Sequence, residues 1–456
     1  MVQNGITNFV GMLDNIMVGR VGTEQMSGIA IVNQLLFVFY IGIFGATSGA
    51  GIFAAQFFGC KDHAGVRHTF RFKMYACLLL LVAGVLIFLA FGEGLIRLYL
   101  HGESGISGTS ALAETSGGSG ASLFVLGASL AYGKRYLWIM LLGLPAFCVE
   151  QVYSSTLREC GETKVPMKAG VAAVLVNLAL NYLLIFGSLG FPKLGVEGAA
   201  VATVISRLVQ LSIVVFWAHR HQTAMPFLEG VYHRLGIPGQ LAKNILFRGS
   251  PLLVNELFWS AGMATIMQCY SIRGLAAVAA LNISTTLSNV FQVMFLACGS
   301  AISIIVGQLL GAGKMREAKE TDYKLITFAV GSCVAAGAIM ALCSPLFPLL
   351  YHTTQGVKGL ASQLISIAAL LLPLNAFTNA SYFTLRCGGK TGVTFLFDSV
   401  FLWCVNIPVA YLLSRHSTLP MVTMYLCCQL IDVVKCVIGF RLVKKGVWIQ
   451  NIVKQI

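Results

Sequence analysis

Twelve long apolar runs constrain this chain more than any other feature of its sequence. They lie at about 5–22, 28–57, 74–97, 136–157, 167–187, 197–218, 249–270, 276–310, 325–350, 361–384, 393–413 and 419–440. A run of roughly 20 apolar residues crosses the hydrocarbon core as one helix. Only 11% of the 456 residues are charged, against roughly 25% in soluble domains. The sequence therefore predicts an all-α polytopic membrane protein with twelve transmembrane helices and excludes an ordinary soluble protein.

Lys and Arg are distributed unevenly over the segments between these runs. One alternate set of connections, with the C-terminal tail, holds 21 of them, and the opposite set holds 8. Basic residues accumulate on the cytoplasmic side of membrane proteins. We therefore expect a multi-pass protein of the cell (plasma or inner) membrane with both termini in the cytoplasm. Because the net charge of +14 is spread over short clusters, we expect no nucleic-acid partner.

The cysteines and histidines form no pattern of metal ligands. Ten of the 13 cysteines lie inside apolar runs, no CxxC pair is present, and all eight histidines lie in polar connections. Small buried residues explain the cysteines better than a metal site does. Paired acid–base groups within the spans are also missing, so we expect no metal, no cofactor and no enzyme.

Two short patterns recur in the second half of the chain. The AQFFG segment at 55–59 resembles GQLLG at 307–311, 252 residues later, and Arg158 with its following GET resembles Arg386 with its following GKT, 228 residues later. Repeats of six spans each have the same orientation, because six is even. We therefore predict two parallel six-helix repeats around a central cavity.

The predicted organisation has four parts. Residues 1–218 form an N-terminal lobe and residues 249–440 a C-terminal lobe. Residues 219–248 form a cytoplasmic linker, and residues 441–456 a cytoplasmic tail. The fall in offset from 252 to 228 gives the first lobe about 24 additional residues, which we assign to the Gly/Ser/Ala-rich segment 104–131. We expect this segment to be a flexible extracytoplasmic insertion.

Several motifs resemble those of the multidrug and toxic compound extrusion (MATE) family of cation-coupled exporters. The segment MLDNIMVGRVG at 12–22 is similar to the first-helix signature of that family, and the two Gln-x-x-Gly patterns match the ends of its second and eighth helices. Further similar segments lie at 157–161, 176–182, 195–203 and 255–259. The resemblance covers nearly the whole chain. It implies two lobes around a cavity that opens alternately to either side, with an organic, usually cationic compound leaving while Na⁺ or H⁺ enters.

The resemblance implies a site for the coupling ion or proton in the N-terminal lobe. Asp14 matches the family's ion-binding Asp. Asn177 and Asn181 share one helical face, and Thr203 adds a hydroxyl from the next span. Such oxygen ligands suit a hard cation such as Na⁺ or tune a protonatable Asp. The structural alternatives are helix capping by Asp14 and interhelical hydrogen bonds between the asparagines.

Two departures from the family pattern affect this site. Several members have a second acidic residue where this chain has Asn181, so the site carries one negative charge fewer. The apolar run before Asp14 is about two turns shorter than in the family. Either the first helix is short and its site opens more to the cytoplasm, or the chain begins upstream of Met1.

Glu256 is, by resemblance, the carboxylate of the C-terminal lobe that senses the coupling ion, the cationic substrate or both in turn. It follows Pro251 by five residues, where a Pro lets a helix break. Intramembrane carboxylates are costly and usually mark ion or substrate paths. A buried Glu that serves packing is the structural alternative. No cation lies at helical spacing from Glu256 within its own run, and we expect Asp432 and Lys435 to pair with each other.

Neutral polar residues in the second half are weaker candidates for the substrate cavity. Some relatives have an Asp where this chain has Asn375. Helix–helix hydrogen bonds explain these side chains at least as well as substrate contacts do. The candidates are Gln268, Asn282, Asn289, Gln292 and Asn375.

The sequence thus favours a cation-coupled (H⁺ or Na⁺) antiporter that exports small organic, cationic drugs or toxins and acts as a monomer in the lipid bilayer. The alternative is a flippase for a lipid-linked precursor with a related two-lobe fold. A strongly basic cavity would favour a flippase, but only Arg207 is an intramembrane cation away from a helix end.

The charge bias predicts a cytoplasmic C-terminus. A reporter enzyme fused after Ile456 that folds only in the cytoplasm should be active, and one that folds only outside should be inactive. The reverse result would contradict the predicted topology.

Overall fold

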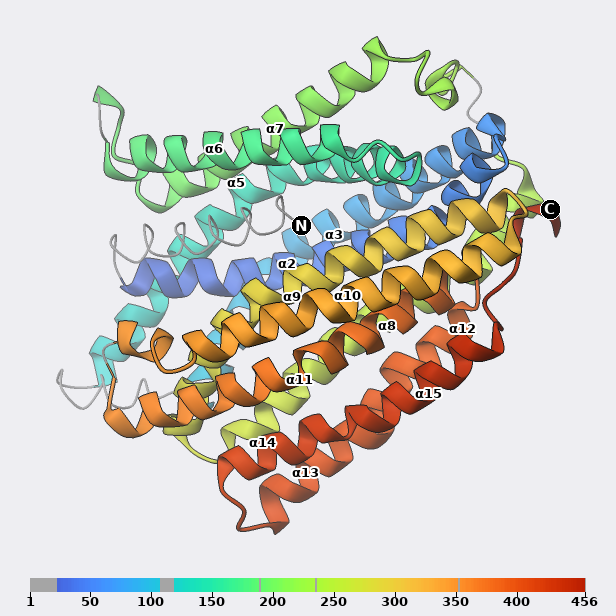
Figure 1. Ribbon diagram of the computed structural model, residues 1–456. Helices are drawn as coiled ribbons and strands as arrows, with labels where there is room; N and C mark the ends of the chain where they lie inside the picture. Colours follow the sequence, from blue (N-terminus) through green and yellow to red (C-terminus); the bar gives the residue numbers. More distant parts are fainter. Residues whose placement is uncertain (1–22, 107–118, 188–189, 234–235, 352, 456) are drawn as a thin grey trace. The chain divides into compact units, whose positions relative to one another are not determined.

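The computed structural model describes residues 23–106, 119–187, 190–233, 236–351 and 353–455, and every regular element in these ranges is helical (Figure 1). The expected first run at 5–22, with Asp14, lies outside them. The long helices are α2 (Thr23–Gly59), α3 (His63–Ile106), α5 (Ser119–Glu159), α6 (Lys164–Phe186), α7 (Val196–Arg220), α8 (Gly239–Ser271), α9 (Leu275–Gly311), α10 (Met315–Cys343) and α11 (Gln355–Cys387).

Two further helical stretches complete the chain. The first contains α12 (Thr391–Phe395), two π-helical turns at Leu396–Val400 and Leu402–Asn406, and α13 (Ile407–His416). The second contains α14 (Met421–Leu430) and α15 (Asp432–Lys445). Short 3₁₀ turns lie at Pro226–Leu228, Phe347–Leu350 and Val453–Gln455. Pro408 explains the second π turn, because a helix-internal Pro offers no N–H and its ring displaces the carbonyl of the preceding turn.

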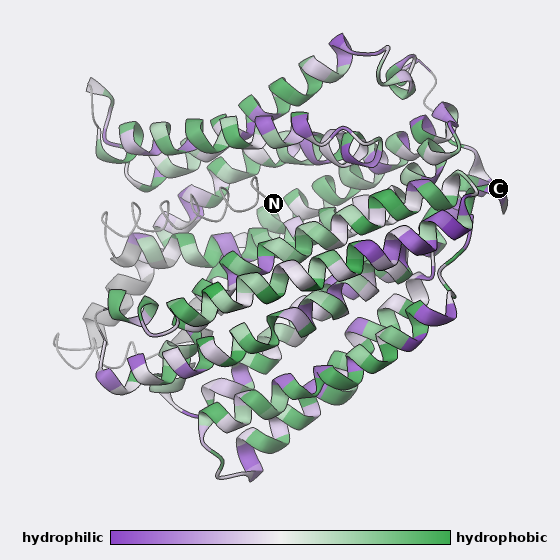
Figure 2. Cartoon of the chain, viewed as in Figure 1, coloured by the Kyte–Doolittle hydropathy of each residue, from purple (hydrophilic) through white to green (hydrophobic). Residues whose placement is uncertain are grey.

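Ten helical segments of the described chain are long and apolar enough to cross a membrane. The 33-residue α8 has similar length but contains Lys243, Arg248 and Glu256. Apolar residues dominate the helix surfaces, and polar ones concentrate toward the helix ends (Figure 2). Large apolar side chains on five different helices are 69–78% exposed, namely Leu79, Leu142, Phe216, Phe247 and Leu342. Such surfaces suit lipid, and the protein is a multi-pass membrane protein.

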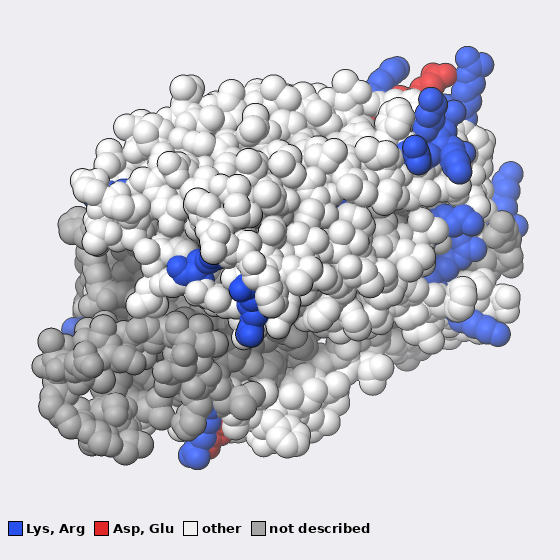
Figure 3. Space-filling view, turned by 90° about the horizontal axis from the view of Figure 1, so that it is seen from below, with Lys and Arg blue, Asp and Glu red and all other residues white. Residues whose placement is uncertain are grey.

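Basic side chains are also distributed as the sequence suggests. On the face shown in Figure 3, most Lys and Arg gather at one end, and the long remainder is largely uncharged. This separation is the pattern that a bilayer imposes on an integral protein.

The helices extend beyond several of the predicted limits. The predicted flexible insertion at 104–131 is wrong in part, because α3 continues to Ile106 and α5 begins at Ser119. Only 107–118 lies outside the described residues. The segment from Ser119 is rich in Ala, Ser and Leu, which are compatible with a helix, and it continues directly into the apolar run that follows.

The predicted linker at 219–248 is also too long, because the following helix begins earlier than predicted. Its last ten residues, from Gly239, form the first turns of α8, and the segment before them carries a 3₁₀ turn. Arg71 anchors this segment, donating from Nε to the Val231 carbonyl at 2.8 Å and from Nη2 to the Gly230 carbonyl at 2.9 Å. The polar stretch before residue 74 is therefore part of α3 and packs inward.

Contacts divide the chain into two compact units. Among the described residues, those of 23–47 and 70–233 form the N-unit, and those of 48–69 and 236–455 form the C-unit. The boundary therefore differs from the predicted 1–218 lobe, because the second half of α2 and the start of α3 pack with the later helices.

Each unit has its own apolar core. In the N-unit, α5, α6 and α7 lie side by side (Figure 1), and Val32, Leu36, Ile96 and Leu144 are fully or almost fully buried. In the C-unit, α9, α10 and α11 pack against one another. Their core is centred on side chains such as Ile302, Val306 and Leu385.

Glycines of the repeated Gln-x-x-Gly pattern allow α2 and α9 to cross closely in the C-unit. A Cβ added at Gly59 would overlap the backbone of Gln308, and one added at Gly311 would overlap the backbone of Gln56. The two contacts are reciprocal, so each helix presents the same residue pair to the other. Only glycine permits this approach of two backbones.

Gln56 also binds the segment after α15, which we call the C-terminal strap (residues 446–455). Fully buried Gln56 donates to the carbonyls of Cys387 and Gln450, at 3.1 and 3.2 Å, and accepts the Ile452 N–H at 2.9 Å. Trp448 is fully buried, and Gly446 ends α15 in the left-handed conformation. The predicted cytoplasmic tail at 441–456 is thus helical to Lys445, and its strap then packs onto the C-unit.

Replacing Gln56 with Leu should destabilise the C-unit by about 2–4 kcal/mol, because three buried backbone groups lose their partner. We expect a lower thermal midpoint in detergent and faster tryptic cleavage near Lys454. The matched control is Gln363→Leu, on an exposed position of α11. Equal stability of the two variants would show that the strap is not held through Gln56.

Candidate functional site

Glu256 lies in the middle of α8 and contacts two residues of α11. The Tyr382 hydroxyl donates to Glu256 Oε1 at 3.4 Å, and Arg386 Nη1 lies 4.0 Å from the same oxygen. The side chains of Arg386 and Glu256 are 4% and 18% exposed. As the sequence indicates, no cation lies at helical spacing from Glu256 within α8 itself. The cation comes from α11, where Tyr382 and Arg386 lie about one helical turn apart. The spacing of residues within α8 carries no information about this partner.

A second ion pair lies beside the first. Lys435 Nζ of α15 donates to Asp398 Oδ1 at 2.6 Å, with the two side chains 16% and 17% exposed. The expected pairing of Lys435 with Asp432 is wrong, and Asp432 instead accepts a hydrogen bond from Asn406 at 3.2 Å. Asp398 lies in the first π turn. The wider turn shifts the register of side chains on that helix.

Asn255 joins the two pairs. Its Nδ2 lies 3.1 Å from Asp398 Oδ2 and 3.3 Å from the Tyr382 hydroxyl, and it donates to both. Ser399 donates to Asn255 Oδ1 at 2.7 Å. We call this set the C-unit polar cluster: Asn255, Glu256, Tyr382, Arg386, Asp398, Ser399 and Lys435. Its two carboxylates and two basic groups balance in charge, which lowers the cost of burial.

The N-unit brings together three of the predicted residues of its site. Asn181 Nδ2 donates to Asn177 Oδ1 at 3.1 Å, and Asn177 Nδ2 donates to Thr203 Oγ1 at 3.3 Å. Asn177 and Asn181 are buried. The contacts form one chain of oxygen and amide groups between α6 and α7. Asp14 lies outside the described residues, so its place beside this chain stays a prediction.

The weaker cavity candidates are scattered over the C-unit. Gln268 of α8, with Asn282 and Asn289 of α9, is exposed, and Gln292 and Asn375 are partly buried. The seven-residue spacing of Asn282 and Asn289 places them on one face of α9. Their contact with a substrate stays a prediction.

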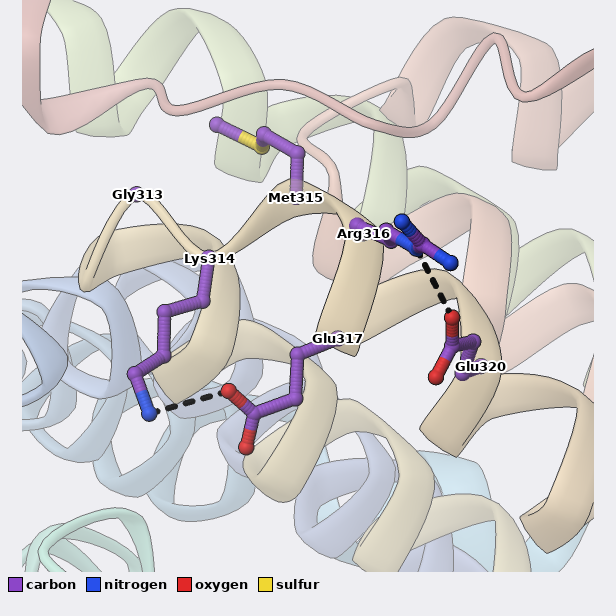
Figure 4. Close-up of a pocket in the computed structure, with 6 residues that line it drawn as sticks. All are labelled: Gly313, Lys314, Met315, Arg316, Glu317 and Glu320. Carbon is purple, nitrogen blue, oxygen red and sulfur yellow. Dashed lines mark hydrogen bonds and ion pairs between the residues drawn. The ribbon is translucent and has the colours of Figure 1, made fainter.

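Other polar groups on the described chain have plain structural roles. The start of α10 forms a shallow pocket closed by its own ion pairs, Lys314 with Glu317 at 2.9 Å and Arg316 with Glu320 at 3.1 Å (Figure 4). These side chains are more than half exposed, and such surface pairs contribute little stability. Among the described residues, no three His, Cys, Asp or Glu side chains gather as metal ligands.

Sequence reasoning missed most of the C-unit polar cluster. Arg386 lies just after the predicted run at 361–384, in a polar connection, and Tyr382 lies inside that run. One signal was present, because Tyr382 and Arg386 are four residues apart and share a face at the end of an apolar run. An Arg that close to a Tyr on one face indicates a polar surface directed at another helix.

Comparisons with known proteins agree with this fold. The MatE family model matches residues 1–183 and 251–412. The chain is 24% identical over 426 residues to "Probable multidrug resistance protein NorM" of Thermotoga maritima, covering 92% of this chain and 84% of that protein. It is also 24% identical over 418 residues to "Multidrug resistance protein MdtK" of Pectobacterium atrosepticum, covering 89% and 83%.

Solved structures show the same fold. A structure described as a multidrug resistance MATE family transporter of the MOP superfamily matches with a TM-score of 0.83 at 18% identity, covering 98% of this chain and 93% of that one. A structure of MATE in the straight conformation matches with a TM-score of 0.82 at 20% identity, covering 98% and 93%. The architecture is that of twelve helices in two six-helix repeats. The chain belongs to the multidrug and toxic compound extrusion (MATE) family of membrane transporters.

Proposed function

We propose that this protein is a multidrug efflux transporter that exchanges organic, cationic drugs or toxins for inward-moving H⁺ or Na⁺ by alternating access. It acts in the cell membrane with both termini in the cytoplasm. The names of the NorM and MdtK relatives support multidrug export, and the lysine and arginine bias supports the orientation.

The observation that carries the proposal is the difference between the two carboxylates of the C-unit polar cluster. Asp398 binds Lys435 directly at 2.6 Å, whereas Arg386 lies 4.0 Å from Glu256, beyond hydrogen-bond distance. The Tyr382 contact to Glu256 is also long, at 3.4 Å. Glu256 is therefore the carboxylate whose partners are held most loosely, and it can exchange them for another cation.

Charge balance explains how such an exchange couples two movements. A carboxylate at membrane depth needs a counter-charge. When H⁺ or Na⁺ neutralises Glu256, a bound organic cation loses its attraction and leaves. When the ion leaves toward the cytoplasm, the negative charge attracts the next substrate. Arg386 balances Glu256 between these states, so an incoming cation must displace it.

The N-unit chain of Asn177, Asn181 and Thr203 would complete a second ion site with Asp14. The three polar side chains offer amide and hydroxyl oxygens within one hydrogen-bonded row. Oxygen ligands of this kind suit Na⁺ or support a protonated carboxyl. Each half would then have one coupling carboxylate, Asp14 or Glu256, and neither could fully replace the other.

Glu256→Gln keeps the shape and hydrogen bonding of the side chain but removes its exchangeable charge. Export of a fluorescent organic cation from vesicles, with Na⁺ and pH gradients imposed separately, should fall to the level of protein-free vesicles. Asp14→Asn should impair export less, because its site already lacks the second acid at Asn181.

The matched control is Glu93→Gln, which removes an exposed carboxylate paired with Arg97 and Lys134. It should export normally. Near-normal export by both Glu256→Gln and Asp14→Asn would mean that these carboxylates are structural, and the antiport mechanism would be abandoned.

A further inference from the structure

Among the described residues, one positive charge of the N-unit lies at membrane depth with no carboxylate within ion-pair distance. Arg207 lies near the middle of α7. Its guanidinium carbon is 4.9 Å from the Tyr40 ring centroid and 4.6 Å from that of Phe147, and Nη2 donates to the Tyr40 hydroxyl at 3.2 Å. Nε of Arg207 is buried and has no hydrogen-bond partner among the described residues.

A carboxylate on the same pair of helices is held by other groups. Buried Glu150 of α5 accepts at Oε1 from Ser154 at 2.5 Å and from Gln210 at 2.8 Å. Gln210 lies three residues after Arg207 on α7, and Phe147 lies three residues before Glu150 on α5. The two helices thus meet at two adjacent levels. Arg207 contacts Phe147 at one level, and Glu150 accepts hydrogen bonds from Ser154 and Gln210 at the other.

The ion pairs between described residues of the N-unit do not include Arg207. Glu93 pairs with Arg97 and Lys134, Glu159 with Lys73, and Glu197 with Arg135. Within the described ranges, no carboxylate oxygen lies within the 4.0 Å ion-pair distance of Arg207. A guanidinium at this depth is costly unless an anion or water meets it. The two aromatic rings supply part of the compensation, and among the described residues only the Tyr40 hydroxyl accepts a hydrogen bond from the guanidinium.

We propose that Arg207, Tyr40 and Phe147 form a subsite for the anionic group of an aromatic substrate, such as a carboxylate or sulfonate. The guanidinium fork matches the geometry of such a group. Tyr40 and Phe147, whose ring centroids lie 4.5 Å apart, offer faces for the aromatic part of the same molecule. This inference rests on the proposed export function and assigns the residues of the N-unit that hold the anionic end of such a substrate.

Two dyes that differ at one group test the subsite. Rhodamine 110 carries a free carboxylate, and rhodamine 123 is its methyl ester. We would measure the Kd of each for the purified full chain by fluorescence polarisation, with wild type, Arg207→Gln and Arg207→Lys. A charged hydrogen bond lost to Gln should raise the ratio of the rhodamine 110 Kd to the rhodamine 123 Kd about tenfold to a hundredfold.

Arg207→Lys keeps the charge but loses the fork, so its ratio should lie between those of the other two proteins. Arg135→Gln, which changes an exposed Arg of the same unit, should leave the ratio unchanged. Arg207→Lys also tests the subsite if the Gln variant does not fold. A ratio of the two Kd values equal to that of wild type would then show that the guanidinium group does not bind the carboxylate.

Three results would overturn the subsite. Wild type fails to bind rhodamine 110, the ratio stays the same in Arg207→Gln, or both dyes lose affinity equally while the Na⁺ and pH dependence of transport changes. The last result would assign Arg207 to the coupling carboxylate Asp14. Dye binding without export in vesicles would contradict the proposed function alone and leave the subsite standing.

Discussion

The cost of an unpaired charge in the hydrocarbon core governs where the polar groups of this protein lie. Lys73 of α3 is fully buried, and its ammonium group donates to Glu159 at 2.5 Å and to Ser155 and Thr156 at 3.2 Å each. Asp398 and Lys435 satisfy each other in the same way. Removing one member of such a pair leaves the other buried without compensation, which costs several kcal/mol. These two pairs therefore have structural roles.

Among the described residues, the charges of Glu256 and Arg207 are less closely paired than these. Glu256 has a cation only at 4.0 Å, and Arg207 has two rings and one hydroxyl. Intramembrane charges that are not fully satisfied by their own unit are the ones that solutes can reach and bind. The two residues that we propose to take part in transport are thus distinguished by the strength of their local pairing and not by residue type.

Close helix packing provides the frame for these groups. The Gln-x-x-Gly pattern brings the ends of α2 and α9 into backbone contact through Gly59 and Gly311. The same pattern supplies Gln56, which binds the C-terminal strap. A motif that marks an internal repeat therefore also has a direct packing role. The π turns before Pro408 also affect the packing. They set the register in which Asp398 and Ser399 meet Asn255 on α8.

The sequence by itself determined the class of the protein and the existence of its charged positions. Apolar runs of about 20 residues cannot be accommodated without a membrane, and a carboxylate such as Glu256 inside one of them is conspicuous. Helical spacing also placed Asn177 and Asn181 on one face. The partners of these residues were decided only by the tertiary structure. Arg386 and Lys435 reach Glu256 and Asp398 from other helices, and periodicity within one helix carries no information about which faces of distant helices meet.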